Sequence, residues 1–136
     1  MTSPALLPTA LQFHDSEVSG VEAVNGDVRV CFSAASVHQS QRATGGEARD
    51  GYVSAVELCL HQAAWSGLLN ECVGSLSDGE LSVDGGLIKS MPLPLQATGN
   101  VTLKLAFANG ALLCATGTAV HVSQRGQPQF VENFAC

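Results

Sequence analysis

The stretch VEAVNGDVRV, residues 21–30, alternates apolar and polar residues on both sides of an Asn-Gly dipeptide. Alternation with a period of two is typical of a half-buried strand. Asn-Gly is a favoured pair for a two-residue type I′ turn, because both central residues of that turn need positive φ. We therefore predict an antiparallel hairpin in which Val21 faces Val30 and Glu22 faces Arg29, the second pair being oppositely charged.

A second Asn-Gly dipeptide, at residues 109–110, separates two more alternating runs. If it also forms a two-residue loop, Leu105 faces Cys114 on a shared apolar face. In that register the small residues of the segment 113–119 present an outer face on which a second sheet could pack closely. Since exposed strand edges favour pairing between chains, we expect self-association.

Asp84-Gly85 is a third turn signal of the same type. It places Leu81 opposite Ile88 and the charged pair Glu80 and Lys89 opposite each other. Each of these three turns, taken as a two-residue loop, places apolar residues together on one face of its hairpin. This agreement among the three turns is the strongest structural information in the sequence.

The predicted fold class is all-β, a mostly antiparallel meander that forms a small barrel or a two-layer sandwich, with at most one short helix. A chain of 136 residues has the length of one domain, so we predict a single β domain over residues 1–136. Residues 1–10 are expected to be flexible. Residues 36–51 are polar and lack periodicity, which predicts an exposed loop.

The charge balance argues against several classes of partner. Twelve acidic residues stand against six basic ones, for a net charge of −6, and the basic residues are scattered. Binding to nucleic acid or to an anionic membrane needs a clustered basic surface, so we expect neither. The sequence shows no secretory signal and no apolar run long enough for a membrane helix, which predicts a cytoplasmic protein.

The five cysteines are odd in number, and no two of them stand in C-x-x-C spacing. Such spacing is the usual sequence sign of a zinc or thioredoxin-like site. We therefore expect cysteines that act as small apolar residues, with no metal site, no cofactor and no native disulfide.

The segment 13–16, Phe-His-Asp-Ser, and the segment 130–134, Phe-Val-Glu-Asn-Phe, contain the candidate ligand-binding residues His14, Asp15 and Glu132. A carboxylate on an apolar strand face must be paired or protonated, and His14 could pair with Glu132 if the chain ends meet. The alternatives are structural. Asp15 or Ser16 would cap backbone donors, and Glu132 would lie at a solvated rim.

Glu57, Cys59 and His61 alternate along a predicted strand that spans residues 52–61. They share the face opposite the core, and a solvated surface is the favoured interpretation. They could hold a metal only if a fourth group, for which His121 is the candidate, came alongside.

The opening LQFHDSEV, residues 11–18, followed by the hairpin residues DVRVCFSA, resembles small bacterial domains of unknown function that begin L-x-F-H-D-[SA]-x-[LV]. The resemblance covers about the first quarter of the chain and the terminal FVENF. It implies a β-rich bacterial fold and carries no activity with it.

No catalytic motif stands out in the sequence, which favours a non-catalytic binding or interaction module over an enzyme. The expected partner is another protein or a second copy of the chain. A small-ligand-binding β-barrel is the first alternative. An acid–base enzyme that uses Glu132 and His14 is the second.

Overall fold

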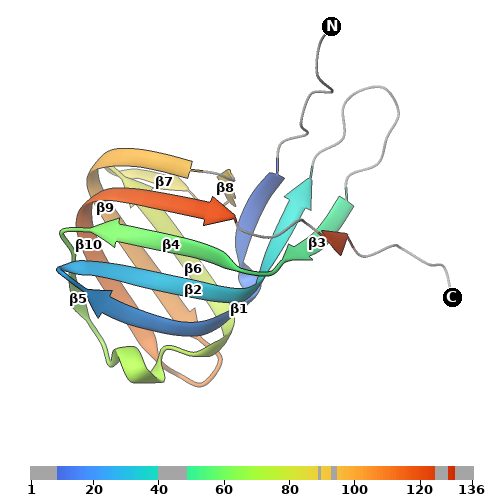
Figure 1. Cartoon of the computed structure of the whole chain (residues 1–136), viewed down its shortest axis with the longest axis horizontal. Helices are drawn as coiled ribbons and strands as arrows, with labels where there is room; N and C mark the ends of the chain where they lie inside the picture. Colours follow the sequence, from blue (N-terminus) through green and yellow to red (C-terminus); the bar gives the residue numbers. More distant parts are fainter. Residues whose placement is uncertain (1–8, 40–48, 89, 93–94, 125–128, 131–136) are drawn as a thin grey trace, which may run out of the picture.

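A computed structural model describes residues 9–39, 49–88, 90–92, 95–124 and 129–130 of the chain (Figure 1). Its main feature is a closed antiparallel barrel of six strands, which confirms the all-β prediction in its barrel form. In order around the ring these strands are β1 (Thr9–Val24), β2 (Asp27–Gln39), β4 (Val56–His61), β10 (Leu112–Gln124), β9 (Leu95–Phe107) and β6 (Gly74–Val83).

Short outer strands extend the barrel. They are β3 (Arg49–Val53) on β2, β11 (Gln129–Phe130) on β3, β5 (Ala64–Ser66) on β10, β7 (Gly86–Ile88) on β6 and β8 (Ser90–Pro92) on β1. The helical element of the described residues is a single 3₁₀ turn, η1 (Leu69–Glu71). Within the same ranges, no helix has the length and apolar character that crossing a membrane would require.

The barrel interior is filled by the apolar residues of each alternating run. In β4, Val56, Leu58 and Leu60 are at most 1% exposed, while the residues between them face outward. Alternation of inward and outward residues is what closure of a small barrel demands. The largest fully buried side chains are Phe13, Phe32, Leu11, Leu58, Leu60, Leu81, Met91, Leu103 and Leu113.

The first predicted hairpin is confirmed. Val21 pairs with Val30 and Glu22 with Arg29, and the Arg29 Nη1 atom lies 3.4 Å from Glu22 Oε1. The turn between β1 and β2 has φ values of 54° at its asparagine and 84° at its glycine, as a type I′ turn requires.

A β-bulge interrupts β1 after Gln12, where residues 13–16 have no paired residue in the ladder with β2. Asp15 has a φ of 67°, which lets the chain turn out of the ladder and return. The Ser16 hydroxyl is fully buried. It donates a hydrogen bond of 2.7 Å to the Gln12 carbonyl and accepts one of 2.8 Å from the Ser36 N–H. The prediction that a residue of this segment caps backbone groups is confirmed for Ser16.

The second predicted hairpin forms, but its predicted register is wrong by one residue. Leu105 pairs with Leu113 and Lys104 with Cys114, because the loop is longer than two residues: Phe107 N–H donates to the Ala111 carbonyl. A slip of one residue exchanges the two faces of a strand. Leu113 and the small residues near it therefore do not form the predicted outer face, since Leu113 is 1% exposed and points into the barrel.

The third predicted hairpin is confirmed at Leu81 and Ile88, whereas Lys89 lies outside the described residues. The predicted loop 36–51 has fewer residues than expected, because residues 36–39 continue β2 and residues 49–51 begin β3. Residues 9 and 10 of the predicted flexible N-terminus likewise belong to β1.

The ring is closed unevenly. β1 pairs with β2 along most of its length, but β1 and β6 share two residue pairs, Glu17 with Ser75 and Val18 with Gly74. The β1–β6 seam is therefore the shortest ladder of the ring within the described ranges.

Candidate functional site

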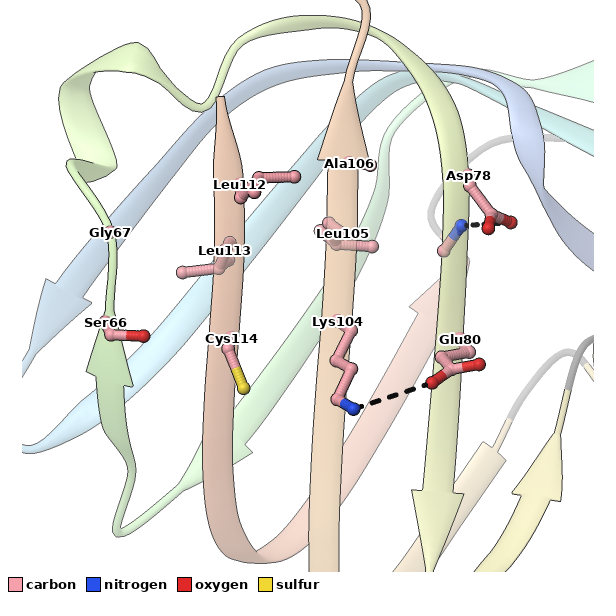
Figure 2. A pocket seen from close by; sticks show the side chains of 11 residues that line it. Ser66, Gly67, Asp78, Glu80, Lys104, Leu105, Ala106, Leu112, Leu113 and Cys114 are labelled. Atoms are coloured by element: carbon pink, nitrogen blue, oxygen red, sulfur yellow. Dashed lines mark hydrogen bonds and ion pairs between the residues drawn. The ribbon is translucent and has the colours of Figure 1, made fainter. Parts of the chain in front are cut away.

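A groove with a volume of about 580 Å³ lies on the outside of the barrel (Figure 2). It crosses β10, β9 and β6, and Ser66 and Gly67 close one end. The strand registers explain its shape. Ser66, Cys114, Lys104 and Glu80 lie opposite one another as one row across the strands.

A second row, Leu112, Ala106 and Asp78, runs parallel to the first. A third row, which faces the barrel interior, lies between these two across the same strands. It consists of Leu113, Leu105 and Gly79. Because the side chains of Leu113 and Leu105 are turned inward and Gly79 has none, the strip between the rows is backbone, and the outward side chains of the two rows form the walls of the groove.

The two ends of the groove differ in chemistry. Leu112 is 68% exposed and makes the β10 end apolar. Ala106 and Lys104 lie on opposite walls in the middle, on β9. Lys104 Nζ lies 3.9 Å from Glu80 Oε1 of the β6 end, where Asp78 accepts the Gly79 N–H at 2.9 Å. The β6 end thus carries the carboxylates of Glu80 and Asp78, with the Lys104 ammonium beside Glu80.

The predicted site residues His14 and Asp15 do not line the groove. His14 and Asp15 lie on the outward bulge of β1, with 3.8 Å between His14 Nε2 and Asp15 Oδ2 and side chains 60% and 75% exposed. Glu132 lies outside the described residues. The pairing of His14 with Glu132 therefore stays a prediction.

A second group of polar and metal-ligating side-chain types lies on the outer face of β2 and β4. Asp27, Cys59 and His61 each offer a ligand atom, and these atoms all lie within 4.8 Å of one another. Asp27 and His61 lie next to the last ladder pair of β2 and β4, Val28 with Leu60, and His121 of β10 is opposite Cys59. The structure confirms that Cys59 and His61 share the outward face, and it adds Asp27, which sequence reasoning missed.

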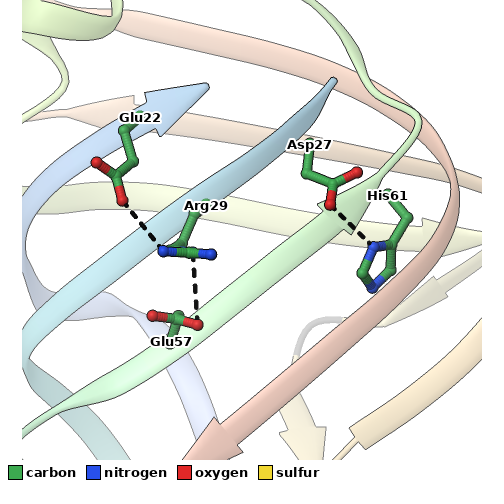
Figure 3. Close-up of polar contacts among 5 residues, drawn as sticks. All are labelled: Glu22, Asp27, Arg29, Glu57 and His61. Carbon is green, nitrogen blue, oxygen red and sulfur yellow. Dashed lines mark hydrogen bonds and ion pairs between the residues drawn. The ribbon is translucent and has the colours of Figure 1, made fainter. Parts of the chain in front are cut away.

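Arg29 lies beside this group and joins two carboxylates (Figure 3). Its Nη1 atom is 3.4 Å from Glu22 Oε1, and its Nε atom is 3.6 Å from Glu57 Oε1. The second distance is an ion-pair distance rather than a hydrogen bond. The Arg29 charge is thus compensated by neighbours on either side.

Two thiols are perturbed by their surroundings. Burial raises the pKa of Cys59, and the negative charge of Asp27 raises it further. Burial also raises the pKa of Cys72, with a smaller contribution from Glu71. Both groups therefore favour the protonated thiol, which is the unreactive form.

We expect Cys114 to react with a thiol reagent at pH 8 at least about tenfold faster than Cys72, because reaction requires an accessible thiolate. Cys114 is exposed and Cys72 is buried. Timed alkylation followed by peptide mass spectrometry measures each rate in one sample. Equal rates in the native protein would contradict this assignment, and equal rates in denaturant are the control.

Comparison of the chain with protein-family models, curated proteins and solved structures gave no match in any of the three, so the resemblance of residues 11–18 to small bacterial domains stays a prediction.

Proposed function

We propose that this chain is a non-catalytic binding module that holds an extended, basic and apolar segment of another protein in its outer groove. The observation that carries the proposal is the groove itself, whose floor is backbone and whose two ends differ in chemistry. Cys114 and Lys104 lie opposite each other in one wall of the groove, but the proposal rests on the shape and charge of the groove and not on this pair.

The size of the groove suits a short peptide. From β5 to β6 it crosses three strand spacings, or about 14 Å, which is the length of about four extended residues. An apolar side chain of the peptide would contact Leu112 and Ala106. A Lys or Arg farther along would reach Glu80 and Asp78 at the β6 end.

The overall charge supports a basic partner. A net charge of −6 attracts a cationic segment at long range and speeds its encounter. A second copy of this chain carries the same charge, so the groove favours a different protein over self-association. A cytoplasmic location fits this proposal, since Cys59, Cys72 and Cys114 are free thiols and disulfides are rare in the cytosol.

The test is selection of peptides from a random display library, followed by titration of the synthesised consensus. We expect peptides that combine an apolar residue with Lys or Arg. Glu80→Lys and Leu112→Glu should each weaken binding by about tenfold, equivalent to about 1.4 kcal/mol. Glu22→Lys makes the same charge reversal outside the groove and should change the affinity less than twofold.

The contrary results are equally specific. Enrichment of acidic peptides, or an affinity that Glu80→Lys and Leu112→Glu leave unchanged, would overturn the proposal. Light scattering is the second measurement. A dimer that Leu112→Glu dissociates would assign the groove to a second copy of the chain and not to a peptide.

A further inference from the structure

We propose that Asp27, Cys59 and His61 form a binding site for a divalent metal ion of the zinc class on the outer face of β2 and β4. The three side chains come from two strands and offer one carboxylate oxygen, one thiol sulfur and one imidazole nitrogen. Thiolate and imidazole ligands together select zinc and related transition metals over magnesium or calcium. This site lies apart from the groove and does not depend on the proposed function.

The geometry of the group fits a tetrahedral ion. His61 Nδ1 lies 3.3 Å from Asp27 Oδ2 (Figure 3). In a tetrahedral zinc site with nitrogen and oxygen ligands at about 2.0–2.2 Å, neighbouring ligand atoms lie about 3.3–3.5 Å apart. The sulfur of Cys59 is within 4.8 Å of the other two ligand atoms, so a movement of no more than about 1.3 Å completes a three-ligand site.

The Asp27 carboxylate is held in position before any metal binds. Its Oδ1 atom accepts the Gln62 backbone N–H at 3.1 Å, which leaves Oδ2 directed at His61. Gln62 has a φ of 49°, and this left-handed residue turns the chain between β4 and β5. Next to it, the Ala63 N–H donates to the Gly26 carbonyl at 2.7 Å. The turn that starts β2 and the end of β4 are thereby fixed together, which orders two of the three ligands.

The charge around the group favours a cation. Asp27, Glu22 and Glu57 contribute three carboxylates, and Arg29 contributes one guanidinium that contacts Glu22 and Glu57. Arg29 also hydrogen-bonds the Cys59 thiol, and a bound metal would take its place there. The side chains of Asp27 and His61 are 35% and 44% exposed, so an ion can enter from solvent without opening the barrel. A fourth position remains for water, as in zinc sites with three protein ligands.

The experiment is titration of the chelator-treated full-length protein with cobalt(II) and, separately, zinc(II). Cobalt bound by a thiolate gives a charge-transfer absorption that cobalt bound only by oxygen and nitrogen lacks. We expect one equivalent of cobalt with this band, and displacement of the cobalt by zinc. Zinc should also protect Cys59 from alkylation, which peptide mass spectrometry detects at that residue.

Matched variants decide between this site and adventitious binding. Cys59→Ser should abolish the cobalt band, and Asp27→Asn and His61→Ala should each weaken zinc binding by more than about tenfold, since even indirect supporting residues have effects of that size. The controls are Cys114→Ser and His14→Ala, which remove an exposed thiol and an exposed imidazole elsewhere. Both should leave the cobalt band and the zinc affinity unchanged. Circular dichroism checks that each variant is folded.

Three results of the titrations would overturn the proposal, and a fourth comes from the alkylation experiment. The first three are the absence of saturable cobalt binding, a cobalt charge-transfer band that persists in folded Cys59→Ser, and a loss of that band in Cys114→Ser as large as the loss in Cys59→Ser. Protection of Cys59 against alkylation keeps the test decisive if one substitution prevents folding, because it is measured on the natural sequence. Lack of protection by zinc would exclude the thiol as a ligand.

Discussion

Replacing Phe13 with alanine is expected to lower the free energy of unfolding by about 3–5 kcal/mol, the usual cost of truncating a buried phenylalanine. Phe13 is 1% exposed and packs directly on Gly79 of β6. A Cβ atom built on Gly79 would lie 2.7 Å from both Cβ and Cγ of Phe13. Because β6 carries only a hydrogen where the phenylalanine sits, it has no side chain there that could fill the resulting cavity.

Equilibrium unfolding in urea, followed by circular dichroism, measures the change. His14→Ala is the matched control at the next residue, where the side chain is 60% exposed and the expected change is below about 0.5 kcal/mol. A loss at His14 as large as the loss at Phe13 would contradict this description of the bulge. It would instead favour a buried partner for His14.

Ser16→Ala is expected to destabilise the protein by about 1–3 kcal/mol, because it leaves the Ser36 N–H and the Gln12 carbonyl without the hydroxyl that satisfies both. Ser16 is fully buried, and its two hydrogen bonds span 2.7 Å and 2.8 Å. Thermal unfolding of the variant and the natural sequence at one scan rate measures the effect.

Ser33→Ala on the neighbouring strand is the control for this second prediction. The Ser33 hydroxyl donates a hydrogen bond of 2.8 Å to Glu17 Oε1 at an exposed position, where water can replace it. Its loss should change stability by less than about 0.5 kcal/mol. If the two serine variants have the same stability, the hydroxyl of Ser16 does not hold the bulge.

The sequence predicted well those parts of the fold that depend on local backbone conformation. Asn25 and Asp84 both precede a glycine and both adopt positive φ, so the hairpins at these turns have the predicted registers. Alternation then placed Val56, Leu58 and Leu60 inside the barrel. Each of these predictions depends on residues within a few positions of one another.

The hairpin at Asn109 could not be predicted in the same way, because contacts distant in sequence shape its loop. Asn109 Nδ2 donates to the Glu71 carbonyl at 2.9 Å, while Asn109 Oδ1 accepts the Ala111 N–H at 2.8 Å. Glu71 is 38 residues away and gives no signal near the turn. The resulting slip turned Cys114 outward, so the row of residues that forms one wall of the groove could not be identified from the sequence.

The proposed metal-binding group could be predicted only in part from the sequence. Cys59 and His61 alternate along one strand, which placed them on one face, but Asp27 is 34 residues from His61 and joins them only through the pairing of β2 with β4. The predicted partner His121 does pair with Cys59. Spacing rules for metal motifs count positions along one chain segment. They therefore cannot identify a ligand that a neighbouring strand contributes.

The short β1–β6 seam has a consequence for the stability of the protein during storage in solution. Two residue pairs join these strands, so partial opening should begin there at a lower free energy than global unfolding. Amide hydrogen exchange would then be fastest, among the ring strands, at Gly74 and Ser75. Each opening uncovers two unpaired strand edges that can recruit another molecule. Slow aggregation during storage is therefore expected to start at this seam rather than from the unfolded chain.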